Sequence, residues 1–130
     1  MERRMALKVA VLGATGMVGR EILSILAERG FPADTMYALA SRKLMGAEVS
    51  YGDAILKAKD VDEFDFTTVQ LCIMATGDPA ARKYGNAISA KGCIVIDTSR
   101  AFRMDPQVPL VMPEVNAAAI DGYAKRNIVS

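Results

Sequence analysis

The sequence predicts an α/β fold in which a mainly parallel β-sheet lies between two helical layers. Short apolar runs have the composition of buried parallel strands, and they lie at 9–12, 35–41, 69–75 and 92–97. Stretches with helical spacing of apolar residues follow the first and third runs, at 21–27 and 80–90. Strands that alternate with helices in this way are typical of doubly wound, Rossmann-like sheets.

A glycine-rich turn joins the first strand to the first helix. Gly13, Gly16 and Gly19 follow the strand with the spacing Gly-x-x-Gly-x-x-Gly. A helix that begins here points unpaired N–H groups and a partial positive charge at the carboxyl end of the sheet, where a phosphate binds favourably. We expect a tight turn at Gly13, room for a pyrophosphate at Gly16 and packing of the helix against the strand at Gly19. Thr15 adds a hydroxyl donor, and the alternative is a turn that binds nothing.

The end of the second strand predicts which coenzyme binds. NAD-binding domains of this architecture usually carry an acidic residue there, which binds the ribose 2′-hydroxyl. This chain has Ser41, Arg42 and Lys43 instead. A hydroxyl and two cations suit a 2′-phosphate, and each charge-assisted hydrogen bond is worth roughly 1.5–3 kcal/mol. The sequence therefore favours NADP over NAD, with a solvated basic loop as the alternative.

The region between the second and third strands predicts a β-hairpin. Gly52 and Asp53 separate two short, loosely alternating segments there. Residues 61–66, which combine acidic groups with two phenylalanines, predict a helical turn over a sheet edge. We assign no chemistry to them.

A second candidate ligand loop follows the third strand. Ala75, Thr76 and Gly77 come directly after the apolar run, and open α/β sheets bind ligands at the carboxyl ends of their strands. Asp78 is predicted to be the N-cap of the next helix and Pro79 its first residue.

Composition excludes several classes of function. The net charge of +1 gives no field that would attract nucleic acid, and no apolar run is long enough to span a membrane. There is no histidine, which is the commonest general base, and no Cys/His cluster for a transition metal. Cys72 and Cys93 fall on apolar strands, where we expect inert, buried thiols. The absence of a secretory leader and of a disulfide framework favours the cytoplasm.

Three segments resemble the N-terminal coenzyme domain of bacterial aspartate-semialdehyde dehydrogenases: Gly13–Gly19, Ala40-Ser41 and Ala101–Asn116. The last is the most specific, because N-acetyl-γ-glutamyl-phosphate reductases, the nearest alternative, do not usually carry its Phe-Arg-Met-Asp-Pro sequence. The resemblance covers residues 8–130. It implies that residues 1–130 form one NADP-binding domain, which we expect to be incomplete.

The resemblance also implies a reaction. Enzymes of this family convert aspartyl phosphate reductively to aspartate semialdehyde through a thioacyl-enzyme, in lysine, threonine and methionine biosynthesis. They are cytoplasmic homodimers or homotetramers. Position by position, the resemblance implies that NADP contacts Gly13, Thr15, Gly16, Met17, Val18, Ser41, Arg42, Lys43, Ala75, Thr76 and Gly77. Arg103 would hold the substrate phosphate with its planar fork of donors, and a surface ion pair with Asp105 is the alternative for this residue.

The chain also departs from the family pattern. Thr98 stands where the family has asparagine, Arg100 is a bulky replacement, and Asp78 is charged where small residues are usual. The family's catalytic cysteine is expected directly after Ser130. We therefore expect the catalytic and dimerisation domain to lie outside this chain, and the isolated chain to be inactive and to expose apolar surface. A non-catalytic nucleotide-binding paralogue is the alternative.

Overall fold

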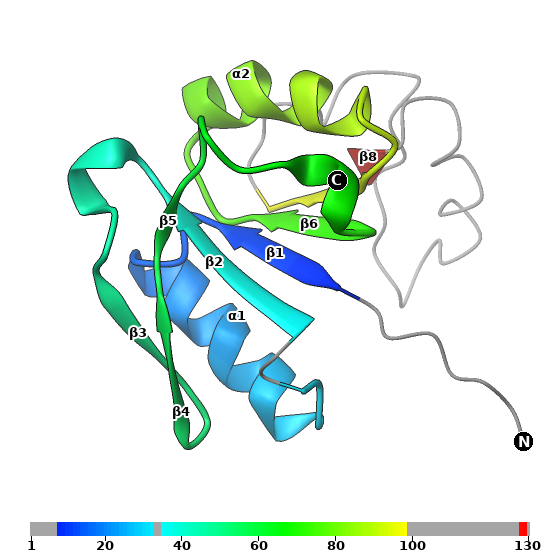
Figure 1. Cartoon of the computed structure of the whole chain (residues 1–130). Helices are drawn as coiled ribbons and strands as arrows, with labels where there is room; N and C mark the ends of the chain where they lie inside the picture. The colour runs from blue at the N-terminus through cyan, green and yellow to red at the C-terminus, as the bar shows by residue number, and fades with distance from the viewer. Residues whose placement is uncertain (1–7, 33–34, 99–127, 130) are drawn as a thin grey trace, which may run out of the picture.

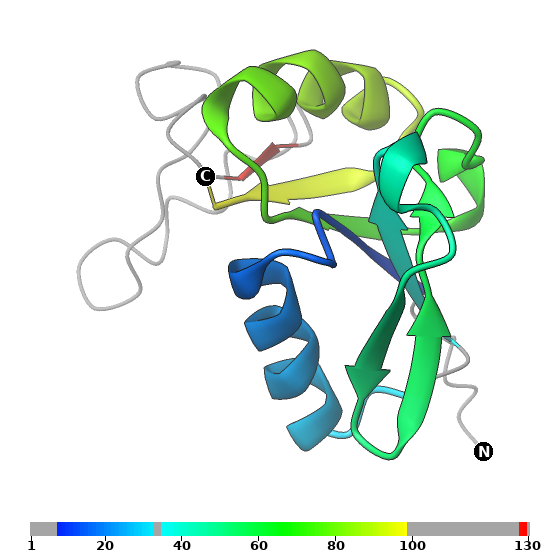
Figure 2. The same ribbon diagram turned by 90° about the vertical axis from the view of Figure 1, so that its left-hand side faces the viewer.

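A six-stranded parallel sheet forms the centre of the computed structural model, which describes residues 8–32, 35–98 and 128–129. Its strand order is β5-β2-β1-β6-β7-β8. Helix α1 (Met17–Glu28) lies on one face and α2 (Asp78–Ser89) on the other (Figures 1 and 2), so the predicted three-layer, doubly wound fold is confirmed. The strands are β1 (Val9–Leu12), β2 (Met36–Ala40), β5 (Lys59–Asp60), β6 (Leu71–Met74), β7 (Ile94–Asp97) and β8 (Ile128–Val129).

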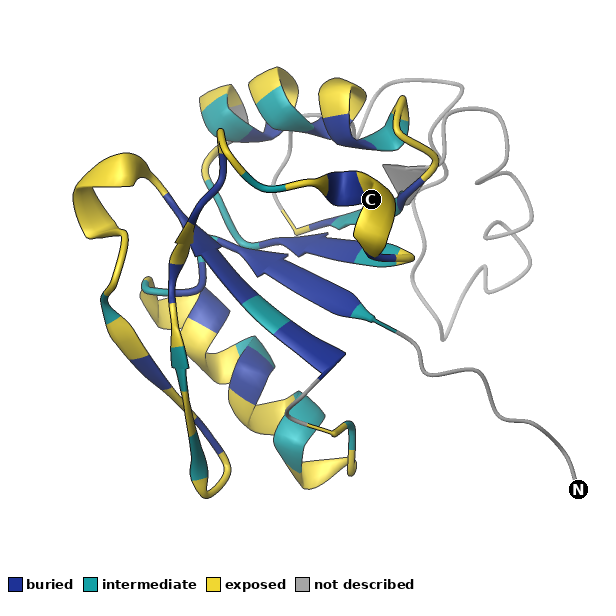
Figure 3. Ribbon diagram, in the orientation of Figure 1, coloured by how far each residue is buried: buried dark blue, intermediate teal, exposed yellow. Residues whose placement is uncertain are grey.

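The core lies on both faces of the sheet, because alternate residues of each strand point to opposite sides. All of β1 is buried, as Figure 3 shows in dark blue. One cluster joins the sheet to α2 and includes Ala10, Leu12, Ala81 and Ile88. The other joins the sheet to α1 and includes Val9, Val11, Leu23, Val49 and Tyr51.

The predicted hairpin is confirmed, and it shares the face of the sheet that α1 covers. It consists of β3 (Glu48–Tyr51) and β4 (Ala54–Lys57), which pair antiparallel. Val49 and Tyr51 are buried in the cluster that contains α1, and the Tyr51 hydroxyl donates a hydrogen bond to the Phe31 carbonyl at 2.6 Å. Figures 1 and 2 show the hairpin beside α1, in the connection between β2 and β5.

Three local predictions need correction. Helix α1 begins at Met17, four residues before the predicted start at residue 21, so Gly19 lies within its first turn. Helix α2 begins at Asp78 with Gly77 as its N-cap, so the cap precedes Asp78 by one residue. Glycine suits this position because it accepts the extended backbone that a cap requires. Residues 61–63 form a turn and the 3-10 helix η3 (Phe66–Thr68) follows, capped by the Asp65 side chain, so the helical turn lies later than predicted.

The predictions for Arg100 and Arg103 fall outside the described residues. The last described residues form β8, which pairs parallel with β7. Among the described residues, no helix combines the length and the apolar character needed to cross a membrane.

Candidate dinucleotide-binding site

The carboxyl ends of β1 and β6 lie side by side at the point where the chain changes direction across the sheet. Leu12 pairs with Met74, and the Ala75 N–H donates to the Leu12 carbonyl at 2.8 Å. From these ends, residues 13–16 lead to α1 on one face and residues 75–77 lead to α2 on the other (Figure 1). This is the topological switch point at which open α/β sheets bind ligands.

Gly13 makes the tight turn that the sequence predicts. Its φ of +84° lies in the left-handed region that favours glycine. A Cβ here would lie 2.5 Å from the Ala75 carbonyl oxygen and 3.1 Å from Thr76 Cγ2. Gly13 therefore lets the two loops of the switch point approach each other closely.

Gly19 allows the first turn of α1 to pack against the glycine turn. A Cβ at Gly19 would overlap the Gly13 carbonyl oxygen and lie 2.7 Å from Ala14 Cα. The close approach is thus to the turn rather than to the strand before it. The Arg20 Nε–H also donates to the Thr15 carbonyl at 3.0 Å, which ties the same loop to the helix.

Gly16 and Gly77 are different, since the fold does not require glycine at either position. Their φ angles of −81° and −75° are open to any residue. An added Cβ would have its nearest neighbour at 3.6 Å for Gly16 and at 3.9 Å for Gly77, which is ordinary contact. Both residues are exposed N-caps of long helices. The missing side chains leave both helix N-termini open to close approach by a ligand.

Several polar groups at these two helix N-termini lack partners among the described residues. The first backbone hydrogen bonds of the two helices are Arg20 N–H to Gly16 O and Ala81 N–H to Gly77 O, both 3.0 Å. The N–H groups before them have no partner within their helices. Thr76 Oγ1 is buried and has no hydrogen-bond partner among the described residues. A buried hydroxyl of this kind needs a partner, and a phosphate or ribose oxygen supplies one. The residues present therefore fit a dinucleotide.

The remaining predicted contacts lie around the same edge of the sheet. Met17 and Val18, in the first turn of α1, are 87% and 54% exposed. Ser41 is the N-cap of the 3-10 helix η2 (Arg42–Leu44), which begins where β2 ends. Ser41, Arg42 and Lys43 are all exposed. The loop after β1 is joined to β2, because the Gly13 and Ala14 N–H groups both donate to the Leu39 carbonyl.

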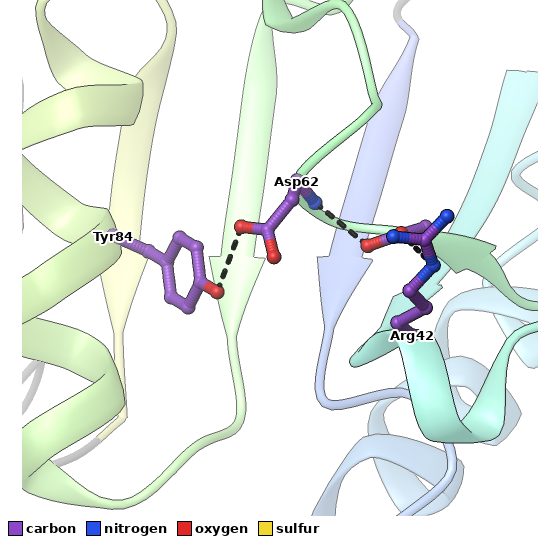
Figure 4. Close-up of polar contacts among 4 residues, drawn as sticks. Arg42, Asp62 and Tyr84 are labelled. Atoms are coloured by element: carbon purple, nitrogen blue, oxygen red, sulfur yellow. Dashed lines mark hydrogen bonds and ion pairs between the residues drawn. The ribbon is translucent and has the colours of Figure 1, made fainter.

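Asp60 was missed by sequence reasoning. Its Oδ2 lies 3.9 Å from Arg42 Nε, and its side chain is 3% exposed. Figure 4 draws this ion pair as a dashed line at Arg42. It ends a strand of two residues within an acidic stretch, so no periodicity or motif marked it. The pairing of β5 with β2 would have placed Asp60 beside Ala40 and so identified it, but the sequence does not reveal that register.

Both cysteines are buried in the core, as predicted. Burial raises the pKa of the Cys93 thiol to about 11. Burial also raises the pKa of the Cys72 thiol, and the neighbouring Cys93 raises this pKa further. Both thiols therefore remain protonated at neutral pH, and neither supplies a thiolate nucleophile.

We expect both thiols to be unreactive in the folded chain. With Ellman's reagent at mildly alkaline pH, colour should develop slowly in buffer and rapidly in guanidinium chloride, because unfolding exposes the sulfur atoms and restores their ordinary pKa. A rapid reaction in buffer would show that a thiol is accessible and contradict the burial.

The comparisons with known proteins identify the family of this domain. Residues 8–123 match the family described as semialdehyde dehydrogenase, NAD binding domain. The aspartate-semialdehyde dehydrogenase of Rickettsia bellii is 40% identical over 122 residues, which are 94% of this chain and 36% of that protein. The chain thus spans about a third of the length of this relative.

Solved structures give the same result. Aspartate semialdehyde dehydrogenase II of Vibrio cholerae, complexed with ASA, superposes with a TM-score of 0.90 at 36% identity, covering 96% of this chain and 41% of that one. A probable aspartate-semialdehyde dehydrogenase of Pseudomonas aeruginosa gives 0.83 at 38% identity, covering 90% and 35%. The resemblance seen in the sequence is confirmed, and the chain belongs to the semialdehyde dehydrogenase family as its NAD-binding domain.

Proposed function

We propose that this chain is the NADP-binding domain of an aspartate-semialdehyde dehydrogenase. The observation that carries the proposal lies at the switch point. Among the described residues, Gly16 and Gly77 leave two helix N-termini uncovered and Thr76 Oγ1 has no partner. The relatives that match along almost the whole chain are aspartate-semialdehyde dehydrogenases, and this supports the choice of enzyme.

The pyrophosphate would be held by the first turn of α1. Gly13, Thr15 and Gly16 present backbone to it, and the partial positive charge of the helix end favours its negative charge. Met17 and Val18 would give apolar contact to the nicotinamide half. On the other side of the switch point, Ala75, Thr76 and Gly77 would form the wall, with the Thr76 hydroxyl as hydrogen-bonding partner.

The 2′-phosphate would be held by Ser41, Arg42 and Lys43. These residues are exposed at the end of β2, which is where a Rossmann-like domain meets the adenosine ribose. A bound NADPH supplies hydride for reduction of an acyl group in such enzymes. The protein's own contribution is to bind and orient the coenzyme.

The rest of the reaction is proposed from the resemblance. Arg103 would bind the phosphate of aspartyl phosphate in a homodimeric or homotetrameric, cytoplasmic enzyme. The thiolate and the base of that reaction would come from outside residues 1–130, because this chain has no histidine and only buried cysteines.

Coenzyme titration tests the proposal. We expect NADPH to bind this chain about tenfold more tightly than NADH, because a 2′-phosphate gains charge-assisted hydrogen bonds to Ser41, Arg42 and Lys43. The measurement is nicotinamide fluorescence at fixed ionic strength, with Lys57→Ala, an exposed cation on the hairpin, as the control variant. Equal affinities would overturn the role of these three residues, and no binding of either coenzyme would overturn the proposed function.

A further inference from the structure

A buried carboxylate lies directly behind the proposed 2′-phosphate site. Asp60 ends β5 and pairs with Ala40, the last residue of β2, so it sits next to the turn that carries Ser41 and Arg42. Its side chain is 3% exposed. Aspartate is rarely buried to this extent unless it is paired.

Both oxygen atoms of this carboxylate have partners. Oδ1 accepts a hydrogen bond from the Asp62 N–H at 3.0 Å, and Oδ2 forms the ion pair with Arg42 Nε at 3.9 Å. The Asp62 carboxylate in turn accepts a hydrogen bond from the Tyr84 hydroxyl of α2 at 3.0 Å. Figure 4 shows these contacts running from α2 to Arg42. The carboxylate is therefore held in place before any ligand arrives.

The geometry of the ion pair leaves most of the guanidinium available. The nitrogen atom of Arg42 that faces Asp60 is Nε, while the planar group carries further N–H donors on Nη1 and Nη2. The Arg42 side chain is 80% exposed. A guanidinium can thus face a carboxylate with one edge and a phosphate with the other.

We infer that Asp60 is a positioning residue for coenzyme choice, which holds Arg42 so that its outer N–H groups face the 2′-phosphate of NADP. This rests on the proposed function. A free arginine loses rotamer freedom when it binds a ligand, whereas an arginine already held in place loses less, and the difference appears as affinity.

Simple charge repulsion makes the opposite prediction. A carboxylate close to a phosphate weakens its binding, so removing the carboxylate should strengthen the binding of NADPH. If Asp60 instead positions Arg42, its removal weakens the binding of NADPH and leaves NADH unchanged. The sign of the change distinguishes the two.

The first experiment compares Asp60→Asn with Asp62→Asn in the full 130-residue chain. Asparagine at position 60 keeps an oxygen for the Asp62 N–H but cannot pair with Arg42. Asp62→Asn removes the same charge two residues away, from a carboxylate that bonds to Tyr84. We expect Asp60→Asn to weaken NADPH binding about fivefold to tenfold with NADH unchanged, and Asp62→Asn to leave the preference for NADPH intact.

Arg42 variants complete the test. On an Arg42→Ala background, Asp60→Asn should cause no further loss of NADPH affinity, because there is no guanidinium left to position. Arg42→Lys keeps the positive charge on an exposed side chain but lacks the planar fork of N–H donors. It should therefore also lose most of the preference for NADPH over NADH. Because this variant leaves the buried Asp60 unchanged, it tests the inference even if Asp60→Asn does not fold.

The outcomes separate the inference from the proposed function. If the wild-type chain prefers NADPH while Asp60→Asn or Arg42→Lys retains that preference, the inference is overturned and the proposed function stands. Equal weakening of both coenzymes by Asp60→Asn would indicate a purely structural role and also overturn it. If the wild-type chain has no preference, the phosphate site itself is wrong, and the inference falls with it.

Discussion

Replacing Gly19 with alanine is expected to lower the free energy of unfolding by about 3 kcal/mol. The added methyl group would overlap the Gly13 carbonyl oxygen and lie 2.7 Å from Ala14 Cα. Both are backbone atoms of the turn, and that turn is held by two hydrogen bonds to the Leu39 carbonyl. It cannot move aside without breaking them. The measurement is urea unfolding followed by far-ultraviolet circular dichroism, in which the midpoint falls while the slope is unchanged.

The sign of this effect is the test. In an ordinary helix interior, glycine to alanine raises stability by roughly 0.5–1 kcal/mol, because alanine has less conformational freedom to lose. A stabilised Gly19→Ala chain would therefore contradict the close packing of α1 on the glycine turn. Gly16→Ser is the matched control, since it adds a side chain to the same turn where the nearest atom lies 3.6 Å from the new Cβ.

The central features of the fold could be predicted from the sequence, because they rest on local patterns. Strand β1 is buried on both faces and therefore appears as an uninterrupted apolar run. The glycines after it show that a turn leads into a helix, although α1 begins four residues earlier than predicted, and Gly52 marks the turn of the hairpin. In each case the chemistry of a few consecutive residues decides the structure.

Features that depend on distant residues could not be predicted in this way. Asp60 gains its importance from an ion pair with Arg42 and from its register against Ala40, neither of which leaves a sequence pattern. The start of α2 was predicted one residue late, because Asp78 is a favourable cap in isolation while the backbone places Gly77 there. Thr76 could be placed on the loop, but the lack of a partner for its hydroxyl among the described residues is seen only when the surrounding atoms are known.

Serine at position 16 is expected to separate binding from folding. Gly16 caps α1, and serine is a better capping residue than glycine, so stability should stay equal or rise slightly. Its hydroxyl oxygen, however, would accept the same helix N–H groups that a pyrophosphate needs, and its Cβ would occupy the exposed space in front of them. The affinity for NADPH should fall roughly tenfold to a hundredfold.

The loss should be the same for NADPH and NADH, because both coenzymes carry the pyrophosphate. This distinguishes Gly16→Ser from changes at Arg42 or Asp60, which act on the 2′-phosphate and alter the preference between the two coenzymes. Fluorescence titration with each coenzyme, together with urea unfolding of the same samples, measures both effects. Full affinity in a stable Gly16→Ser chain would show that no phosphate approaches this helix end, and the coenzyme would have to bind elsewhere on the sheet.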